Sequence, residues 1–125
     1  MTICFVCSDE ITSDGDFVGF VRFAADGDIW DFIYDEASQT TNVHDDDYHT
    51  AVADTYVVLG MYFNGTTIQG YINGTATGTA ISAADIAAAD FPTAAVVVPT
   101  LAVKGDNAAD FDYTVDWIRV AQLAT

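Results

Sequence analysis

Runs of apolar residues separated by short polar stretches follow one another along most of the chain. Residues 3–8 form a short apolar run, residues 17–23 are apolar on both faces apart from Arg22, and residues 29–34 follow the turn Asp26-Gly27-Asp28. Runs of this length bounded by Gly and Asp are typical of β-strands. Residues 35–55 are polar, and we expect a long surface loop there.

The clearest local signal is the dipeptide Asn64-Gly65 between the runs 56–63 and 66–72. Asn-Gly favours a two-residue type I′ turn, so the sequence predicts a β-hairpin at this point. A second pair, Asn73-Gly74, is expected to end the returning strand.

One short helix is expected among the strands. Ser82 and Asp85 resemble a capping box with Asp in place of Glu, which predicts a helix over residues 83–89 that Pro92 ends. Further strands are predicted at 94–103, where Pro99 indicates an edge strand or a bulge, and at 113–123. We therefore expect one domain over residues 1–125, an all-β antiparallel sandwich with at most one short helix.

The charge balance changes the picture of what this domain can bind. The 125 residues carry 3 Lys and Arg against 19 Asp and Glu, a net charge of −16, and all the acids except Glu10 and Glu36 are Asp. Asp favours turns over helices, which agrees with short strands. Because nucleic-acid and anionic-membrane binding depend on clustered Lys and Arg, we expect neither nucleic acid nor membrane as a partner.

Cys4 and Cys7 form a C-x-x-C pair within a β-like run, and His44 and His49 are the only histidines. An odd offset on a strand sends the two cysteine side chains to opposite faces, so we expect reduced, buried cysteines and loop histidines. The alternatives are a redox pair and a Cys2His2 zinc set, although the linker between the two pairs is much longer than in a zinc finger.

Acidic residues offer a candidate metal site but no enzyme. Asp45, Asp46 and Asp47 present the oxygen ligands that Ca²⁺ prefers, and solvated turn acids are the alternative; no other cofactor is expected. Glycoside hydrolysis needs two carboxylates beside one bond, whereas Glu10 and Glu36 lie on different segments. With no nucleophile elbow or phosphate loop in the sequence, we expect no enzymatic activity.

Two segments resemble a known superfamily. The hairpin over residues 56–74 ends in Tyr-Ile-Asn-Gly, and residues 114–120 read TVDWIRV. Both resemble the hairpin and closing strand of concanavalin A-like jelly rolls, the lectin, laminin-G and glucanase-type sandwiches. With the sequence FVGF at 17–20, the arrangement is similar to small jelly-roll proteins of tailed-phage heads. The resemblance implies a jelly-roll sandwich of reduced size.

In that group the domain decorates the capsid. The resemblance thus implies a virion structural protein, a capsid decoration or cement protein that binds the major capsid protein on the outside of the head and stabilises it. It would be made in the host cytoplasm without a signal peptide and would form a homo-oligomer, by analogy a trimer. Two alternatives stay open: a lectin-like module, calcium-dependent or not, that binds a glycan or host surface, and a tail or fibre component.

The interface residues of such a protein would include its few cations, Arg22, Lys104 and Arg119. A glycan site would instead need exposed aromatic rings. We expect most aromatic residues to lie in the core or at its rim, and the candidates for a sugar platform are Trp30, Tyr34, Tyr48, Tyr56, Tyr62, Tyr71 and Trp117.

Overall fold

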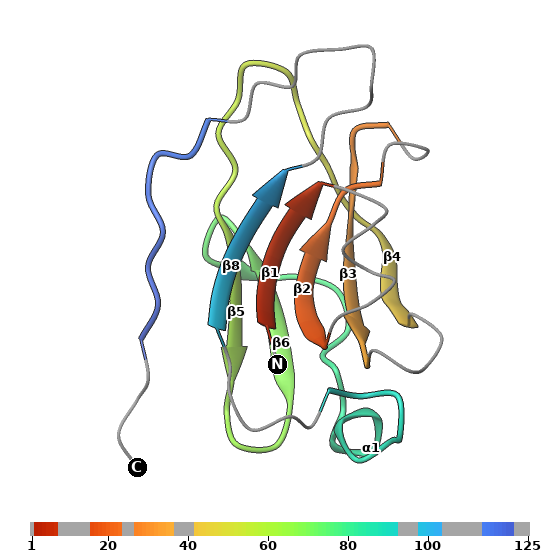
Figure 1. The fold of residues 1–125 in the computed structure, drawn as a ribbon. Coiled ribbons are helices and arrows are strands. Elements are labelled where there is room, and N and C mark those ends of the chain that lie inside the picture. Colours follow the sequence, from red (N-terminus) through yellow and green to blue (C-terminus); the bar gives the residue numbers. More distant parts are fainter. Residues whose placement is uncertain are drawn as a thin grey trace.

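The computed structural model describes residues 2–7, 16–23, 27–36, 42–92, 98–103 and 114–121. Strands dominate the described part of the chain, with one short helix before the last strand (Figure 1). In chain order the elements are β1 (Thr2–Cys7), β2 (Phe17–Val21), β3 (Ile29–Asp35), β4 (Asn42–Thr50), β5 (Leu59–Phe63), β6 (Ile68–Ile72), β7 (Thr75–Ala76), α1 (Ala83–Ile86) and β8 (Val98–Val103).

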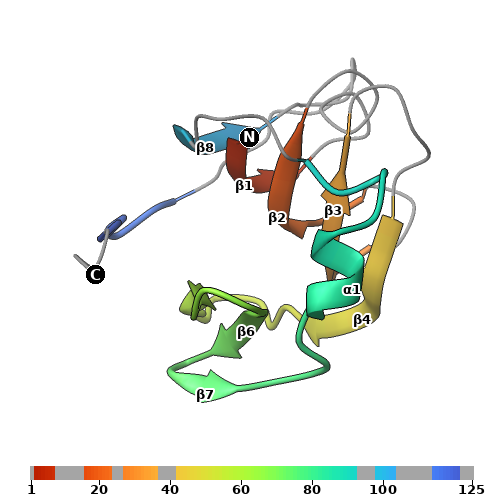
Figure 2. The same cartoon turned by 90° about the horizontal axis from the view of Figure 1, so that it is seen from below.

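The strands form two sheets. One has five strands in the order β4-β3-β2-β1-β8, and the other has three in the order β5-β6-β7. Viewed from below, the three-stranded sheet lies as a second layer against the larger one, with α1 beside β3 and β4 (Figure 2). The predicted all-β class with one short helix is confirmed.

The larger sheet is mixed rather than antiparallel throughout. β2, β3 and β4 pair antiparallel, as do β5, β6 and β7, but β1 runs parallel to both β2 and β8. The antiparallel expectation therefore fails for β1. Apolar periodicity reports which face of a strand is buried but not the direction of its neighbour, so the sequence pattern carried no signal for this pairing. The jelly-roll topology implied by the resemblance stays a prediction.

An aromatic core joins the two sheets. The rings of Phe20 on β2 and Phe32 on β3 stack with centroids 4.9 Å apart, and Tyr48 on β4 lies 5.3 Å from Phe20. Ile68 on β6 and Ile81 close the cluster from the other layer. The core residues of both sheets are buried, and this burial stabilises the fold because removing apolar surface from water is the main favourable contribution to folding.

The central strands β2 and β3 are buried on both faces. A second, smaller cluster of Phe17, Val21 and Ile33 lies on the face opposite Phe20 and Phe32. This explains why residues 17–21 lack the alternation of a half-exposed strand and read as a continuous apolar run.

The prediction of a long loop over residues 35–55 is wrong for residues 42–50, because these residues form the strand β4. The strand pairs with β3 through irregular register, with shifts between Trp30 and Phe32 and between Phe32 and Ile33. Because β4 lies at the edge of the sheet, its polar side chains reach solvent, and only Tyr48 among its described side chains is buried. Because a polar edge strand has the same composition as a surface loop, the sequence pattern did not distinguish the two.

The predicted hairpin is present, but its turn differs from the prediction. Phe63 pairs with Ile68, so residues 64–67 form a four-residue loop, and only Gly65 in it has a positive φ. The Asn64 side chain explains the longer loop, because its Oδ1 accepts the amides of Thr66 at 2.9 Å and Thr67 at 2.8 Å. The two-residue turn with both φ values positive occurs instead at Asn73-Gly74, between β6 and β7.

The capping box is confirmed. The Ser82 hydroxyl accepts the Asp85 amide at 3.2 Å, and the Asp85 carboxylate accepts the Ser82 amide at 2.8 Å. The helix is shorter than predicted and ends at Ile86. None of its residues is fully buried and only Ile86 packs against the core, so few tertiary contacts favour a longer helix.

Two predictions concern the C-terminal third. β8 lies at the edge of the larger sheet, as Pro99 indicated. The strand predicted over residues 113–123 is not formed in its described part, because residues 114–121 have no assigned secondary structure and are exposed. No helix in the described part of the chain is long and apolar enough to span a membrane.

Candidate interaction surface

One layer of the molecule carries no charge. Residues 55–84 contain no Asp, Glu, Lys, Arg or His, although the whole chain has 19 acids and 3 cations. This stretch includes all of β5, β6 and β7. The three-stranded sheet is therefore a neutral layer in a strongly acidic protein, and we call it the neutral sheet.

The outer face of the neutral sheet follows from its register. Leu59, Met61 and Ile72 pack against the core, so the alternate positions of the same strands point away from it. On that outer face Tyr62 lies opposite Gln69, and Tyr62 is 47% exposed. The face thus presents aromatic and amide groups.

Local hydrogen bonds hold this face in place. Gln69 donates from Nε2 to the carbonyl of Thr77 at 2.8 Å, which fixes the amide against the chain that follows β7. Gly60 lies opposite Tyr71, and a Cβ at position 60 would only touch the Tyr71 Cβ at 3.7 Å. Because Gly60 has no side chain, the position two residues before Tyr62 on this face of β5 carries only backbone atoms.

A groove runs along one side of the neutral sheet. It has a volume of about 200 Å³ and is lined by residues 56–59, Leu101 of β8 and residues 114–119. Figure 1 shows residues 114–121, in blue, extended along the side where β8 and β5 form the sheet edges. Tyr56 and Trp117, both lining the groove, are 68% and 59% exposed.

The segment before β5 is anchored at the groove by the second Asn-Gly pair. Asn73 donates its backbone amide to the Val58 carbonyl at 2.8 Å, and the Val58 amide donates to Asn73 Oδ1 at 2.9 Å. Val58 remains 41% exposed. The type I′ turn therefore also positions one wall of the groove.

The structure divides the aromatic candidates into three groups. Trp30, Tyr34 and Tyr48 belong to the core, so the expected core location is confirmed for these three. Tyr71 on β6 is half-buried. Tyr56, Tyr62 and Trp117 are exposed, and they lie on the neutral sheet or in its groove. The signal that locates this surface is the absence of charge over residues 55–84, a feature that no single short motif contains.

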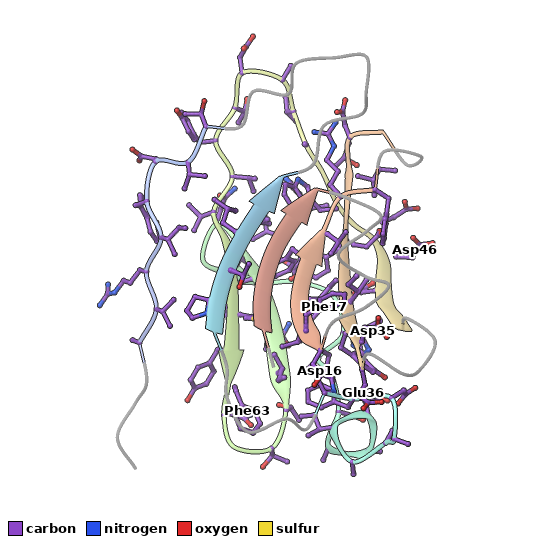
Figure 3. The ribbon with its side chains drawn as sticks, in the orientation of Figure 1. Asp16, Phe17, Asp35, Glu36, Asp46 and Phe63 are labelled. Atoms are coloured by element: carbon purple, nitrogen blue, oxygen red, sulfur yellow. The ribbon has the colours of Figure 1, made fainter. Side chains whose placement is uncertain are left out.

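The three aspartates proposed for Ca²⁺ lie on β4 rather than in a loop. Asp45 accepts the Thr79 amide at 3.0 Å through Oδ2, while the backbone amide of Asp47 donates to buried Asp31 at 3.1 Å. Asp46 is exposed and projects from the side of β4 (Figure 3). Among the described residues no group of three or more His, Cys, Asp or Glu side chains converges on one point, so the structure does not bring the three together. Calcium binding at these residues stays a hypothesis beside its alternative, solvated acids.

The histidines also lie on β4 rather than in a loop. His44 Nε2 is 3.0 Å from the Thr79 carbonyl, and the His44 ring packs edge-on against Phe32 at 6.0 Å. His49 pairs with Trp30 in the ladder between β3 and β4. The predicted strand that contains Cys4 and Cys7 is confirmed as β1. The side chains of these two cysteines lie outside the described part of the structure.

Burial changes the acidity of one core phenol. The pKa of Tyr48 is raised to about 12, first by desolvation and then by the nearby negative charge of Asp45. Its hydroxyl donates to the Thr77 carbonyl at 3.2 Å. Tyr48 is thus a neutral hydrogen-bond donor that ties β4 to the end of the neutral sheet.

The cations proposed for an interface occupy different places. Arg22 forms an ion pair with Asp28 and donates from Nε to the Gly27 carbonyl at 2.5 Å, so it braces the turn between β2 and β3. Arg119 lines the groove, on the C-terminal segment. Lys104 lies outside the described residues. The structure therefore does not bring Arg22 and Arg119 together.

No protein-family model, no curated protein and no solved structure matches the chain.

Proposed function

We propose that this protein is a structural attachment protein of the capsid-decoration kind, which binds a protein particle through the outer face of the neutral sheet. The observation that carries the proposal is the charge asymmetry: a 30-residue neutral stretch, 55–84, within a chain of net charge −16. Interfaces are depleted of charge at their centre and enriched in aromatic residues, which describes the face around Tyr62.

The acidic remainder suits the same role. Many copies on one particle lie close together, and like charges on their outward surfaces keep loaded particles apart. The choice of particle is supported by the resemblance to jelly-roll proteins of tailed-phage heads, whose partner is the major capsid protein. The neutral face then lies against the capsid, and the aspartates face solvent.

The test is co-sedimentation of the purified protein with capsids that lack it. Tyr62→Asp places a carboxylate at the centre of the neutral face and is expected to weaken attachment by tenfold or more, because an unpaired charge in an interface core is costly. Thr50→Asp adds the same charge on exposed β4 and serves as the control, with binding unchanged.

Salt separates this docking mode from an ionic one. Attachment through a neutral face is expected to persist or strengthen as salt rises, because salt screens repulsion between the acidic copies. If attachment instead falls steeply with salt and Tyr62→Asp binds like the wild type, docking depends on the cations and the neutral-face proposal is wrong.

One observation favours glycan binding as a second candidate. Tyr56 and Trp117 line the same groove as Asp116, and both aromatic side chains are mostly exposed. Sugar rings stack on exposed aromatic faces while carboxylates accept their hydroxyl hydrogens. A glycan screen reports this directly: Trp117→Ala would abolish sugar binding and leave capsid attachment intact, whereas a screen without any bound glycan removes this candidate.

A further inference from the structure

The sheet edges of this protein are not equally protected. Natural edge strands carry charges, prolines or irregular register, or are very short, because an open edge pairs with other strands. β4 has register shifts and exposed aspartates, β7 has only two residues, and β8 contains Pro99. β5 has none of these devices: its sequence is Leu-Gly-Met-Tyr-Phe, in regular register with β6.

The open hydrogen-bonding groups of β5 can be assigned. Val58 and Asn64 both bond across to the β6 side, through Asn73 and Thr67. Because alternate residues of an antiparallel strand point their backbone groups to the same side, Leu59, Met61 and Phe63 direct theirs away from β6. Among the described residues, no strand is paired with that edge.

A strand-like segment without a sheet lies on the same side. Residues 114–120 read TVDWIRV, rich in residues that favour strands, yet they have no assigned secondary structure. Trp117, Ile118 and Val120 are 59%, 54% and 55% exposed, so the segment is covered on neither face. It lines the groove beside residues 56–59, close to the start of β5.

We propose that copies of this chain assemble by strand addition, in which residues 114–120 of one copy pair with the open edge of β5 in another. Two copies that exchange segments reciprocally, or a closed ring of copies, would leave no β5 edge open. This inference concerns contacts between copies and does not depend on the particle or on the outer face of the neutral sheet.

Charge selects this side of the molecule for contact between copies. Each copy has a net charge of −16, so acidic surfaces repel, whereas β5 lies in the uncharged stretch and the added segment has one acid and one cation, Asp116 and Arg119. Contact between copies is therefore favoured at β5 and residues 114–120, where neither surface has a net charge, and disfavoured at the acidic surfaces, which repel each other.

The available apolar area agrees with a stable contact. Tyr56, Phe63 and Trp117 are each more than half exposed. At about 200 Å² for a fully buried aromatic side chain, the three rings have roughly 360 Å² left to bury. That is about half of the roughly 800 Å² that each partner contributes to a standard interface, before aliphatic side chains and backbone are included.

The experiment combines mass and tryptophan fluorescence over a dilution series of the full chain. Strand addition predicts a mass two or three times 13.4 kDa that falls on dilution. The chain has 2 Trp, and Trp30 is only 4% exposed, so the change in emission reports Trp117. Its spectrum is expected to shift to the blue as copies associate and to the red on dilution, and added salt is expected to favour association.

Two variants test the strands themselves. Ile118→Asp alters the exposed segment, and Phe63→Pro removes one open amide of β5 at a side chain that is 55% exposed. Each is expected to raise the dissociation constant about tenfold or more. The control is Val52→Asp, at an apolar side chain that is 64% exposed and lies outside the contact, and it should leave the dissociation constant unchanged. Thermal unfolding checks that each variant is folded, and Ile118→Asp decides the matter if Phe63→Pro is not.

A monomer at every concentration would overturn the proposal. So would an oligomer that survives Ile118→Asp with Trp117 still exposed, because the copies would then meet elsewhere. A loss of association in Ile118→Asp with capsid binding retained by the monomer separates this inference from the proposed attachment function.

Discussion

Asn73 and Val58 are joined by two hydrogen bonds across the start of the neutral sheet. The Asn73 amide donates to the Val58 carbonyl at 2.8 Å, and the Val58 amide donates to the Asn73 side chain at 2.9 Å. Asn73 also has a φ of 50, in the left-handed region that Asn tolerates better than other side chains. One residue therefore sets both the β6–β7 turn and one wall of the groove.

Asn73→Ala is expected to lower the free energy of unfolding by about 2 kcal/mol, of which about 1 kcal/mol is backbone strain and about 1 kcal/mol the lost hydrogen bond. Asn73→Gly keeps the conformational freedom and loses only the side-chain acceptor, so about 1 kcal/mol is expected. Urea unfolding measures both. Equal losses in the two variants would show that the positive φ contributes nothing.

The close approach of Gly70 to Tyr48 gives a second prediction. A Cβ at position 70 would lie 2.9 Å from Tyr48 Cζ and closer still to the hydroxyl oxygen. Gly70→Ala is therefore expected to cost about 2 kcal/mol by overpacking between the two sheets. Gly60→Ala, where the nearest atom is at an ordinary 3.7 Å, is the matched control and should change stability by less than about 0.5 kcal/mol.

A double-mutant cycle tests whether the hydroxyl causes the clash. Tyr48→Phe loses the hydrogen bond to the Thr77 carbonyl, at a cost of about 1 kcal/mol. In the Gly70→Ala background the same change also removes the nearest clashing atom, the hydroxyl oxygen, while Cζ stays, so the double variant should be more stable than the sum of the single effects predicts. Strict additivity would assign the clash to the ring carbon rather than to the hydroxyl.

Tyr48 also makes stability depend on high pH. Its pKa is raised to about 12 in the folded protein against an ordinary 10.0. The unfolded chain therefore ionises first, so the contribution is fully present below pH 10 and is lost as pH rises toward about 12. Urea unfolding at pH 9 and pH 11 should show a decline that Tyr48→Phe reduces. An equal decline in the variant would assign it to other groups.

The capping box gives a prediction at the acid end. The pKa of Asp85 is lowered from its ordinary 3.8, first by the Ser82 side chain and then by the Ser82 backbone amide. Since a depressed pKa favours the folded state above 3.8, this contribution is present at neutral pH and is lost as pH falls through the folded value. Ser82→Ala should raise the pKa of Asp85, which an NMR titration measures. It should also lower the free energy of unfolding by about 1 kcal/mol at pH 7. An unchanged Asp85 titration in Ser82→Ala would contradict the cap.

The sequence predicted well what depends on local chemistry. The Ser82 capping box, the hairpin around Asn64-Gly65 and the edge position of the strand with Pro99 each follow from a few adjacent residues. It failed where partners distant in the chain decide the outcome. The parallel pairing of β1 and the strand state of polar residues 42–50 depend on pairing that no short window contains.

The candidate surface was only partly predictable, for the same reason. The absence of charge over residues 55–84 is visible in the sequence, but its meaning depends on those residues forming one sheet. The closing strand expected near Trp117 has the right composition and lacks a paired neighbour among the described residues. Strand propensity indicates that a segment can form a strand, but it forms one only where a sheet edge is available for pairing.

The last prediction concerns Asp45 and Ca²⁺. Asp45 accepts the Thr79 amide, and Gly78 beside it has a φ of 62 that brings the chain against the carboxylate. Asp45→Ala is therefore expected to cost about 1 kcal/mol through the loss of that hydrogen bond, whereas Asp46→Ala, at an exposed side chain on the same strand, should stay within about 0.5 kcal/mol.

Because Asp45 is engaged in this structural hydrogen bond, we expect millimolar Ca²⁺ or EDTA to leave the melting temperature of the wild type unchanged. A ligand that binds only the folded state stabilises it by RT ln(1 + c/Kd), where c is the free ligand concentration, so millimolar Ca²⁺ raises the melting temperature if its dissociation constant lies below the millimolar range. A Ca²⁺-dependent increase that disappears in Asp46→Ala would show instead that the aspartates of β4 bind the ion.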